Sequence, residues 1–255
     1  GKFLLGIGSQ VKAHIEKRFG VGFSPPAARM REYILALKAI FECWQNGAAL
    51  NFQGDYFRHT LMTPMFNPGP LDCKPPPILL GALGPLMTEV AGEVADGLIV
   101  HPFNSMPFLT DHALPAVHRG LAKSGRARSD FILQINAIVI TGDTDEARAA
   151  ATASVKGLLG FYASTPAYRP PMDAVGYGDL QPELNRLSKE GRWDELGSHI
   201  DQTFLDAFAT SGKPEEIAGK LRHKYGAHAD RLAIYAPYAA PDAMWSSIIA
   251  GLKAG

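Results

Sequence analysis

The sequence predicts an α/β protein with parallel strands, and two features of the chain support this prediction. The predicted strands are short and apolar on both faces, which is typical of parallel strands that are covered on both sides. Helical patterns separate these strands, so the chain holds roughly five strand–helix units. This number of units is too low to close a conventional (β/α)₈ barrel, and the patterns alone do not distinguish a barrel from an open sheet.

Prolines, glycines and small polar residues mark the ends of the predicted elements. Ser24 precedes two prolines and is the predicted N-cap of a long helix, whose apolar residues recur at spacings of three and four. Asp143 and Glu146 resemble a capping box in front of a later helix. In chain order the patterns predict a strand (3–7), a helix from Ser24 to Asn46–Gly47, a hairpin (50–60), a strand (78–81), a helix (85–95), a strand (98–100), a helix (106–123), a strand (131–141), a helix to about Ala163, an insertion of short helical pieces (about 164–210), a helix from Pro214, a strand (231–236) and a helix from Pro241.

Composition favours a cytoplasmic protein with one domain over residues 1–255. Apolar residues make up 46% of the 255 residues, charged residues make up 20%, and the formal net charge is zero. This balance gives no electrostatic reason to expect nucleic acid or an acidic membrane as a partner. No apolar run approaches the roughly 18 residues that span a bilayer, and the N-terminus lacks a signal-peptide pattern. Cys43 and Cys73 form no disulfide framework or zinc motif, so we expect no metal.

The stretch "GALGP" connects a predicted strand directly to a predicted helix. Such a helix points its free N–H groups and the positive end of its dipole at the carboxyl edge of the sheet. Gly81 and Gly84 would let a phosphate approach the main chain and would permit a positive φ, while Thr88 would add a hydroxyl. The stretch is therefore a candidate phosphate site. The alternative is a tight turn without a ligand, since the pattern is neither GxGxxG nor a P-loop.

A second turn of the same kind follows the first predicted strand. Gly8, Ser9 and Gln10 again place small residues and polar donors at the carboxyl end of a strand. If the two strands are neighbours, both turns lie at one rim, where α/β proteins bind their ligands. Together the two turns favour a cofactor that carries a phosphate.

Three stretches of the chain resemble one known family. In this order, "GKFLLGIGSQV", "PPILLGALGPLMTEVAGEVADGLIVHPF" and "FYASTPAYRPPMDAVGYGDL" resemble the luciferase-like monooxygenase family, specifically the branch that uses the deazaflavin coenzyme F420. The resemblance covers essentially the whole chain and implies a (β/α)₈ TIM-type barrel with an insertion late in the chain. It also implies that F420 lies at the carboxyl rim. The cofactor-binding residues that it implies are Gly8, Ser9, Gln10, Gly81, Ala82, Leu83, Gly84, Met87 and Thr88.

Two departures from the family pattern affect these expectations. The family's fourth strand aligns with residues 3–7, so we expect this chain to lack roughly the first three βα units, about 90 residues. Either the sequence is truncated at its N-terminus, or a partner supplies these units. Those units carry the family's usual acid/base residues, which leaves the catalytic residue unassigned. They would also cover two sheet edges, and we therefore expect self-association into a homo-oligomer. Leu86 stands where relatives often carry Arg or Lys, which removes a positive charge that would face the phosphate.

Four side chains are candidates for substrate contact. His101 follows a predicted strand, where it would donate to a substrate carbonyl or act near neutral pH; the alternative is a structural histidine. Tyr162, Tyr168 and Arg169 lie next to or within the insertion, a place where loops commonly shape substrate sites. Arg169 is the predicted partner of an anionic group, whereas Tyr162 has the alternative of packing as the last apolar residue of its helix.

The sequence thus predicts an F420-dependent oxidoreductase that transfers a hydride between the deazaflavin and a small organic substrate, such as an alcohol, a carbonyl or an activated alkene. One alternative is an FMN-dependent monooxygenase of the same fold. The other is a non-catalytic subunit that binds a cofactor or pairs with a complete barrel.

Overall fold

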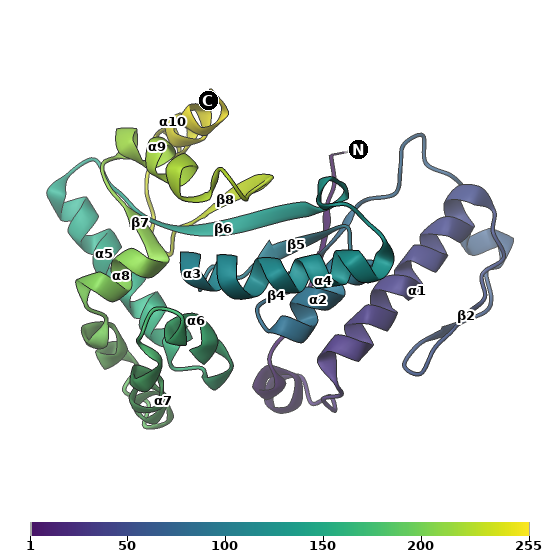
Figure 1. Ribbon diagram of the computed structural model, residues 1–255, viewed down its shortest axis with the longest axis horizontal. Coiled ribbons are helices and arrows are strands. Elements are labelled where there is room, and N and C mark those ends of the chain that lie inside the picture. Colours follow the sequence, from purple (N-terminus) through teal and green to yellow (C-terminus); the bar gives the residue numbers. More distant parts are fainter. Residues whose placement is uncertain (1, 255) are drawn as a thin grey trace. The chain divides into compact units, whose positions relative to one another are not determined.

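The computed structural model describes residues 2–254, which form two compact units (Figure 1). The first unit takes in the chain up to Ile99 together with Pro115–Ile132, and the second takes in Val100–Leu114 and the chain from Leu133 onward. Strands and helices alternate in both units, and the strand pairs of the main sheet within each unit are parallel. The predicted parallel α/β class is confirmed.

The first unit is built on three neighbouring strands in the order β1-β4-β5. β1 and β4 are parallel, with Leu5 opposite Ile78 and Ile7 opposite Leu80. The predicted hairpin is present as an antiparallel pair in which Phe52 lies opposite His59. The elements of this unit are β1 (Leu5–Ile7), α1 (Pro26–Asn46), β2 (Phe52–Gln53), β3 (Arg58–His59), β4 (Ile78–Ala82), α2 (Pro85–Val94), β5 (Gly97–Val100) and α4 (Leu114–Ser124).

The second unit is organised around one long strand, β6. Both β7 and β8 pair with it in parallel; Ile138 lies opposite Ala209 of β7 and opposite Tyr235 of β8. The predicted insertion forms a series of short helices between α5 and β7. The elements are α3 (Met106–Phe108), β6 (Ile132–Ile140), α5 (Asp145–Ala163), α6 (Arg169–Asp173), α7 (Gln181–Lys189), η7 (Trp193–His199), α8 (Gln202–Phe208), β7 (Ala209–Ser211), α9 (Pro214–Tyr225), β8 (Arg231–Tyr235) and α10 (Asp242–Lys253).

Helix caps are where the sequence patterns were least accurate. The predicted cap Ser24 is wrong: Pro25 occupies the N-cap of α1, and the Ser24 hydroxyl instead accepts a hydrogen bond from Arg29 at 3.3 Å. Asp143 is also not the cap of α5, because the Thr144 hydroxyl accepts the N–H of Ala147 at 3.1 Å. In both cases the residue after the predicted cap is the N-cap, and Thr144 has the extended backbone that is typical of this position.

The carboxylate of Asp96 connects β4 to α1 in the first unit. Its oxygens accept the N–H of Ile78 and pair with Lys38, each at 2.8 Å. These bonds hold the start of β4 and connect it to α1. The N–H of Ile132 also donates to the carbonyl of Asp96 at 3.0 Å. Asp96, which follows α2, therefore holds the first residues of both β4 and β6.

Stacked phenylalanine rings form the centre of the second unit's core. Phe103 stacks on Phe208 with ring centroids 4.4 Å apart, and Phe208 stacks on Phe204 at 4.7 Å. All three rings are fully buried, and Ile138 and Ile140 of β6 belong to the same hydrophobic cluster. The stack thus attaches α8 to the carboxyl half of the central strand.

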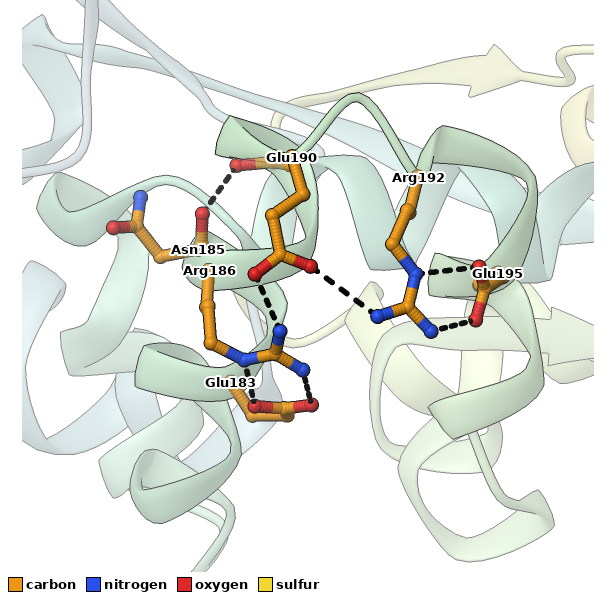
Figure 2. Close-up of polar contacts among 7 residues, drawn as sticks. Glu183, Asn185, Arg186, Glu190, Arg192 and Glu195 are labelled. Atoms are coloured by element: carbon orange, nitrogen blue, oxygen red, sulfur yellow. Dashed lines mark hydrogen bonds and ion pairs between the residues drawn. The ribbon is translucent and has the colours of Figure 1, made fainter.

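A chain of ion pairs covers the outside of the insertion (Figure 2). Arg186 pairs with Glu183 at 2.7 Å, and Arg192 pairs with both Glu190 and Glu195. Glu190 also pairs with Arg186, so the chain joins α7 to η7. Its side chains are 41–49% exposed, which makes each pair a modest, salt-sensitive contribution to stability. Arg186 and Arg192, the two cations of this series of ion pairs, are thus both paired with carboxylates.

The open strand edges that the sequence predicts are also present. Within residues 2–254, β1 pairs only with β4, and β8 pairs only with β6. Self-association through such edges stays a prediction. In the same part of the chain, no helix is long and apolar enough to cross a bilayer.

Helices α2 and α4 touch through two glycines. A Cβ on Gly120 would collide with the carbonyl oxygen of Glu89, and a Cβ on Gly92 would collide with that of Val117. The backbones of α2 and α4 therefore lie so close together that neither glycine position has room for a Cβ atom.

We expect Gly120→Ala to lower the free energy of unfolding by about 1–3 kcal/mol, because the added methyl group overpacks this contact. Gly219→Ala in α9 is the matched control, since its Cβ meets nothing within 4 Å. That control should raise stability by about 0.5–1 kcal/mol through helix propensity. Urea unfolding of both variants provides the measurement, and equal stabilities would contradict the close helix contact.

Candidate functional site

The two predicted cofactor turns lie next to each other in the first unit. Because Ile7 lies opposite Leu80, the segment Gly8–Gln10 leaves the sheet beside Gly81. A Cβ built on Gly81 would lie 3.5 Å from the carbonyl oxygen of Ile7. The prediction that both turns share one rim is confirmed.

The amino end of α2 presents main-chain donors at this rim. Gly84 is the N-cap, Pro85 is the first helical residue, and no side chain caps the helix. The amides of Leu86 and Met87 therefore have no acceptor within the helix, whereas the N–H of Thr88 bonds to Gly84 at 3.0 Å. The first turn also contains no acidic residue. Uncapped donors and the helix dipole together favour an anion at this point.

Open space adjoins the glycines of both turns. A Cβ on Gly8 or Gly84 would meet no atom within 4 Å, so a ligand can approach the main chain at either residue. The expectation of positive φ at Gly84 is wrong, because its φ is −68°. The left-handed residue of this rim is instead Gln10, with φ 57°, a conformation that costs a non-glycine residue on the order of 1 kcal/mol. Strain of this kind is common in ligand-binding turns.

Among the predicted cofactor residues, Thr88 has an additional role inside the helix. It is 1% exposed, and its hydroxyl donates to the carbonyl of Gly84 at 3.0 Å. The hydroxyl proton is therefore engaged within the first turn of α2. Main-chain groups, rather than this side chain, are the free donors at the rim.

A cavity of about 540 Å³ opens beside the first turn. Aromatic and aliphatic side chains of the first unit line it together with Gly8, Ser9 and Arg29. Arg29 donates to Ser24, and its guanidinium lies 5.6 Å from the ring centroid of Phe57. This cavity has room for an apolar or ring-bearing part of a ligand next to the open glycine turn.

His101 lies among aromatic rings of the second unit. Its ring centroid is 5.0 Å from that of Tyr162 and 4.7 Å from that of Tyr168. Desolvation by these surroundings lowers its pKa from 6.5 to about 4. Burial therefore favours the neutral form of His101 at physiological pH, and an acid or base role near neutral pH stays a prediction.

One hydrogen bond assigns the tautomer of His101. Its Nδ1 accepts the N–H of Phe103 at 3.1 Å. A neutral imidazole that accepts at Nδ1 carries its proton on Nε2. His101 consequently presents an N–H donor at Nε2. Donation to a substrate oxygen, its other predicted role, is compatible with this tautomer and stays a prediction.

Tyr235, at the end of β8, is a residue that the sequence patterns did not single out. Its hydroxyl lies 3.3 Å from that of Tyr162, and the two residues are 73 positions apart. Burial and the hydrogen bond to Tyr235 raise the pKa of Tyr162, and burial raises the pKa of Tyr168. The only available signal was the position of Tyr235 at the carboxyl end of a predicted strand. We refer to His101, Tyr162, Tyr168 and Tyr235 as the aromatic cluster.

Arg169 is close to this cluster in sequence but is engaged elsewhere. Its guanidinium pairs with Asp173 at 3.2 Å and with Asp179 at 3.4 Å. Two carboxylates thus already balance the positive charge of Arg169. The attraction of this side chain for the anionic group that the sequence suggested is therefore weak. Across residues 2–254, no three His, Cys, Asp or Glu side chains are arranged to bind a metal ion.

The lowered pKa of His101 predicts how stability depends on pH. Between about pH 6.5 and 4 the unfolded chain takes up a proton that the folded chain does not, so stability falls as pH falls. We expect the wild type to lose about 2 kcal/mol more than His101→Gln when pH drops from about 7 to 4.5. Urea unfolding at both pH values measures the difference. An imidazole ¹⁵N NMR titration of His101 with a midpoint near its ordinary pKa would contradict the assignment.

Comparison with known proteins relates this geometry to a family. The family model described as luciferase-like monooxygenase matches residues 1–231. An uncharacterised protein of Mycobacterium tuberculosis is 46% identical over 232 residues, which cover 91% of this chain and 68% of that protein. The 5,10-methylenetetrahydromethanopterin reductase of Archaeoglobus fulgidus is 27% identical over 222 residues, covering 87% of this chain and 63% of that protein.

A solved structure shows the same fold. The coenzyme F420-dependent tetrahydromethanopterin reductase of Methanopyrus kandleri matches with a TM-score of 0.73 at 19% identity, covering 97% of this chain and 72% of that chain. The resemblance found in the sequence and the luciferase-like fold that it implied are both confirmed. This chain belongs to the luciferase-like monooxygenase family of enzymes.

Proposed function

We propose that the protein is an F420-dependent oxidoreductase that transfers a hydride between the deazaflavin and a small organic substrate. The observation that carries this proposal is the uncapped amino end of α2 beside the open glycine turns. The two reductases described above support the choice of cofactor, since both are methanopterin reductases and the one from Methanopyrus kandleri depends on coenzyme F420.

The residues at the rim fit the phosphate of such a cofactor. The amides of Leu86 and Met87 would bind the phosphate oxygens, and Gly81–Gly84 would let them approach the main chain. The turn Gly8–Gln10 would contact the neighbouring part of the cofactor. When bound, the deazaflavin supplies the hydride-carrying carbon, while the protein binds and orients the reactants.

FMN is the second candidate cofactor, because the family model describes monooxygenases and FMN also carries a phosphate. Separate titrations with F420 and FMN distinguish the two. Binding of FMN without F420 would favour the monooxygenase alternative. Binding of F420 without turnover of any alcohol, ketone or alkene tested would favour the non-catalytic alternative.

A negative charge at the N-cap of α2 should weaken cofactor binding. Gly84 has an ordinary φ and open space around its Cβ position, so Gly84→Glu should fold normally. We expect it to raise the Kd for F420 by about ten-fold or more, because the carboxylate repels the phosphate. Gly84→Gln controls for side-chain size. Calorimetric titration gives both values, and equal losses in the two variants would speak against an anion at this place.

Restoring a cation should have the opposite effect. Leu86 is 71% exposed, so Leu86→Arg removes no core packing. The guanidinium should bond to the phosphate and lower the Kd for F420 by about three- to ten-fold. Leu86→Gln is the neutral control. If the arginine variant binds no more tightly than the glutamine variant, the phosphate does not lie at this end of α2.

A further inference from the structure

We propose that the cavity beside the turn Gly8–Gln10 binds a small organic anion, whose apolar body fills the cavity while its carboxylate bonds to Arg29. Every residue that lines this cavity belongs to the first unit, so the second unit contributes nothing to the site. The proposal goes beyond the oxidoreductase function proposed above. It stands on side chains of the cavity and not on the amino end of α2.

The first argument is an arginine whose charge no carboxylate balances. The Nη1 atom of Arg29 donates to the Ser24 hydroxyl at 3.3 Å, and within residues 2–254 the guanidinium forms no ion pair. Its Nε–H and Nη2–H lie side by side along another edge of the same plane, and such a pair of donors binds a carboxylate bidentately. Because the Ser24 hydroxyl accepts from Arg29, its own proton can donate to the same ligand.

The acidic residue that follows Arg29 in α1 is engaged elsewhere. Glu32 lies about one turn later, and its carboxylate accepts the main-chain N–H groups of Asp55, Tyr56 and Phe57. Among the described residues that line the cavity, none is acidic. An anion in the cavity would therefore meet a cation without a competing carboxylate in the lining.

Rings and aliphatic side chains form most of the remaining wall. Phe19, Val21 and Tyr33 line the cavity and are 55%, 51% and 37% exposed. Exposed apolar side chains that gather around one cavity are typical of a ligand site, whereas single ones scattered over a surface are not. The volume of about 540 Å³ is that of a small-molecule site. A body of one or two fused rings would cover these side chains.

A second guanidinium strengthens the positive field at the cavity. Arg18 lies 5.3 Å from the ring centroid of Phe19, and Arg29 lies 5.6 Å from that of Phe57; both rings line the cavity. Like Arg29, Arg18 forms no ion pair within the described part of the chain. Both charges therefore attract an anion, while Arg29 alone of the two lines the cavity. This arrangement favours a carboxylate over a neutral molecule of the same shape.

Matched probes test the proposal on the full chain without cofactor. 2-Naphthoate and 2-naphthamide share a two-ring body and differ in charge, whereas acetate has the charge without the body. Fluorescence titration gives the Kd of both naphthalene compounds, and competition gives that of acetate. We expect 2-naphthoate to bind about ten-fold more tightly than 2-naphthamide and about a hundred-fold more tightly than acetate. Equal or tighter binding of the amide or of acetate, or no binding of either naphthalene compound, would overturn the proposal.

Variants of Arg29 separate direct contact from structural support through the ratio of the two Kd values. Arg29→Gln should reduce the preference for 2-naphthoate to about two-fold or less, and Arg29→Lys should leave an intermediate preference. Arg31→Gln is the matched control, because Arg31 lies on the same helix and is paired with Glu93 at 2.7 Å. A purely structural effect weakens both probes alike and leaves the ratio unchanged. An unchanged ratio in Arg29→Gln would therefore overturn the role of Arg29.

A change in the apolar wall tests the place of the ligand body. Phe19 is more than half exposed, so Phe19→Ser removes little packing from the free protein. We expect this variant to weaken both naphthalene probes by a similar factor, about three- to ten-fold, because each loses the same apolar contact. Unchanged binding of both probes would place the ligand outside this cavity.

Addition of F420 distinguishes the two sources of such an anion and keeps this inference apart from the proposed function. Displacement of 2-naphthoate by F420 would assign the cavity to an anionic part of the cofactor, and simultaneous binding would assign it to a separate ligand. If F420 fails to bind while 2-naphthoate is still preferred, the proposed function fails and this inference stands. If F420 binds but the ratio does not change in Arg29→Gln, this inference fails and the proposed function stands.

Discussion

Parallel strand pairing is the constraint from which both candidate binding regions follow. A parallel strand must be followed by a connection that crosses back over the sheet, so neighbouring strands bring their carboxyl ends to one edge. In the first unit this constraint sets Gly8–Gln10 beside Gly81 and aims α2 at the same edge. In the second unit it sets Tyr235 opposite Ile138, near the end of β6. Residues that are distant in sequence meet because their strands end together.

The two candidate regions would use different physical means to recognise ligands. The first relies on main-chain amides and a helix dipole, which need space and an uncapped helix more than they need basic side chains. The second relies on burial, which holds His101 neutral and raises the pKa of Tyr162 and Tyr168. A chain with zero formal net charge is compatible with both, since neither depends on a surplus of cations.

The sequence predicted features that depend on local chemistry. Gly47, with φ 70°, ends α1 as expected, and the turn from β4 into α2 follows from Gly84 and Pro85. The exact caps depended on which residue adopts an extended backbone, and the prediction missed Thr144 by one position. β7 was missed because its residues, Ala209–Ser211, include no large apolar side chain. The contact of Tyr162 with Tyr235 depends on tertiary packing across 73 residues, which no local pattern contains.

The tautomer of His101 is connected to the core through Phe103. The backbone N–H of Phe103 bonds to Nδ1 of the imidazole, while the side chain of the same residue stacks on Phe208 of α8. The backbone of Phe103 therefore cannot shift without disturbing a fully buried ring stack. Because this stack includes the last helix of the insertion, packing within the insertion holds the donor proton on Nε2. The insertion thus contributes to the chemistry of the cluster through Phe103, in addition to the tyrosine side chains at its start.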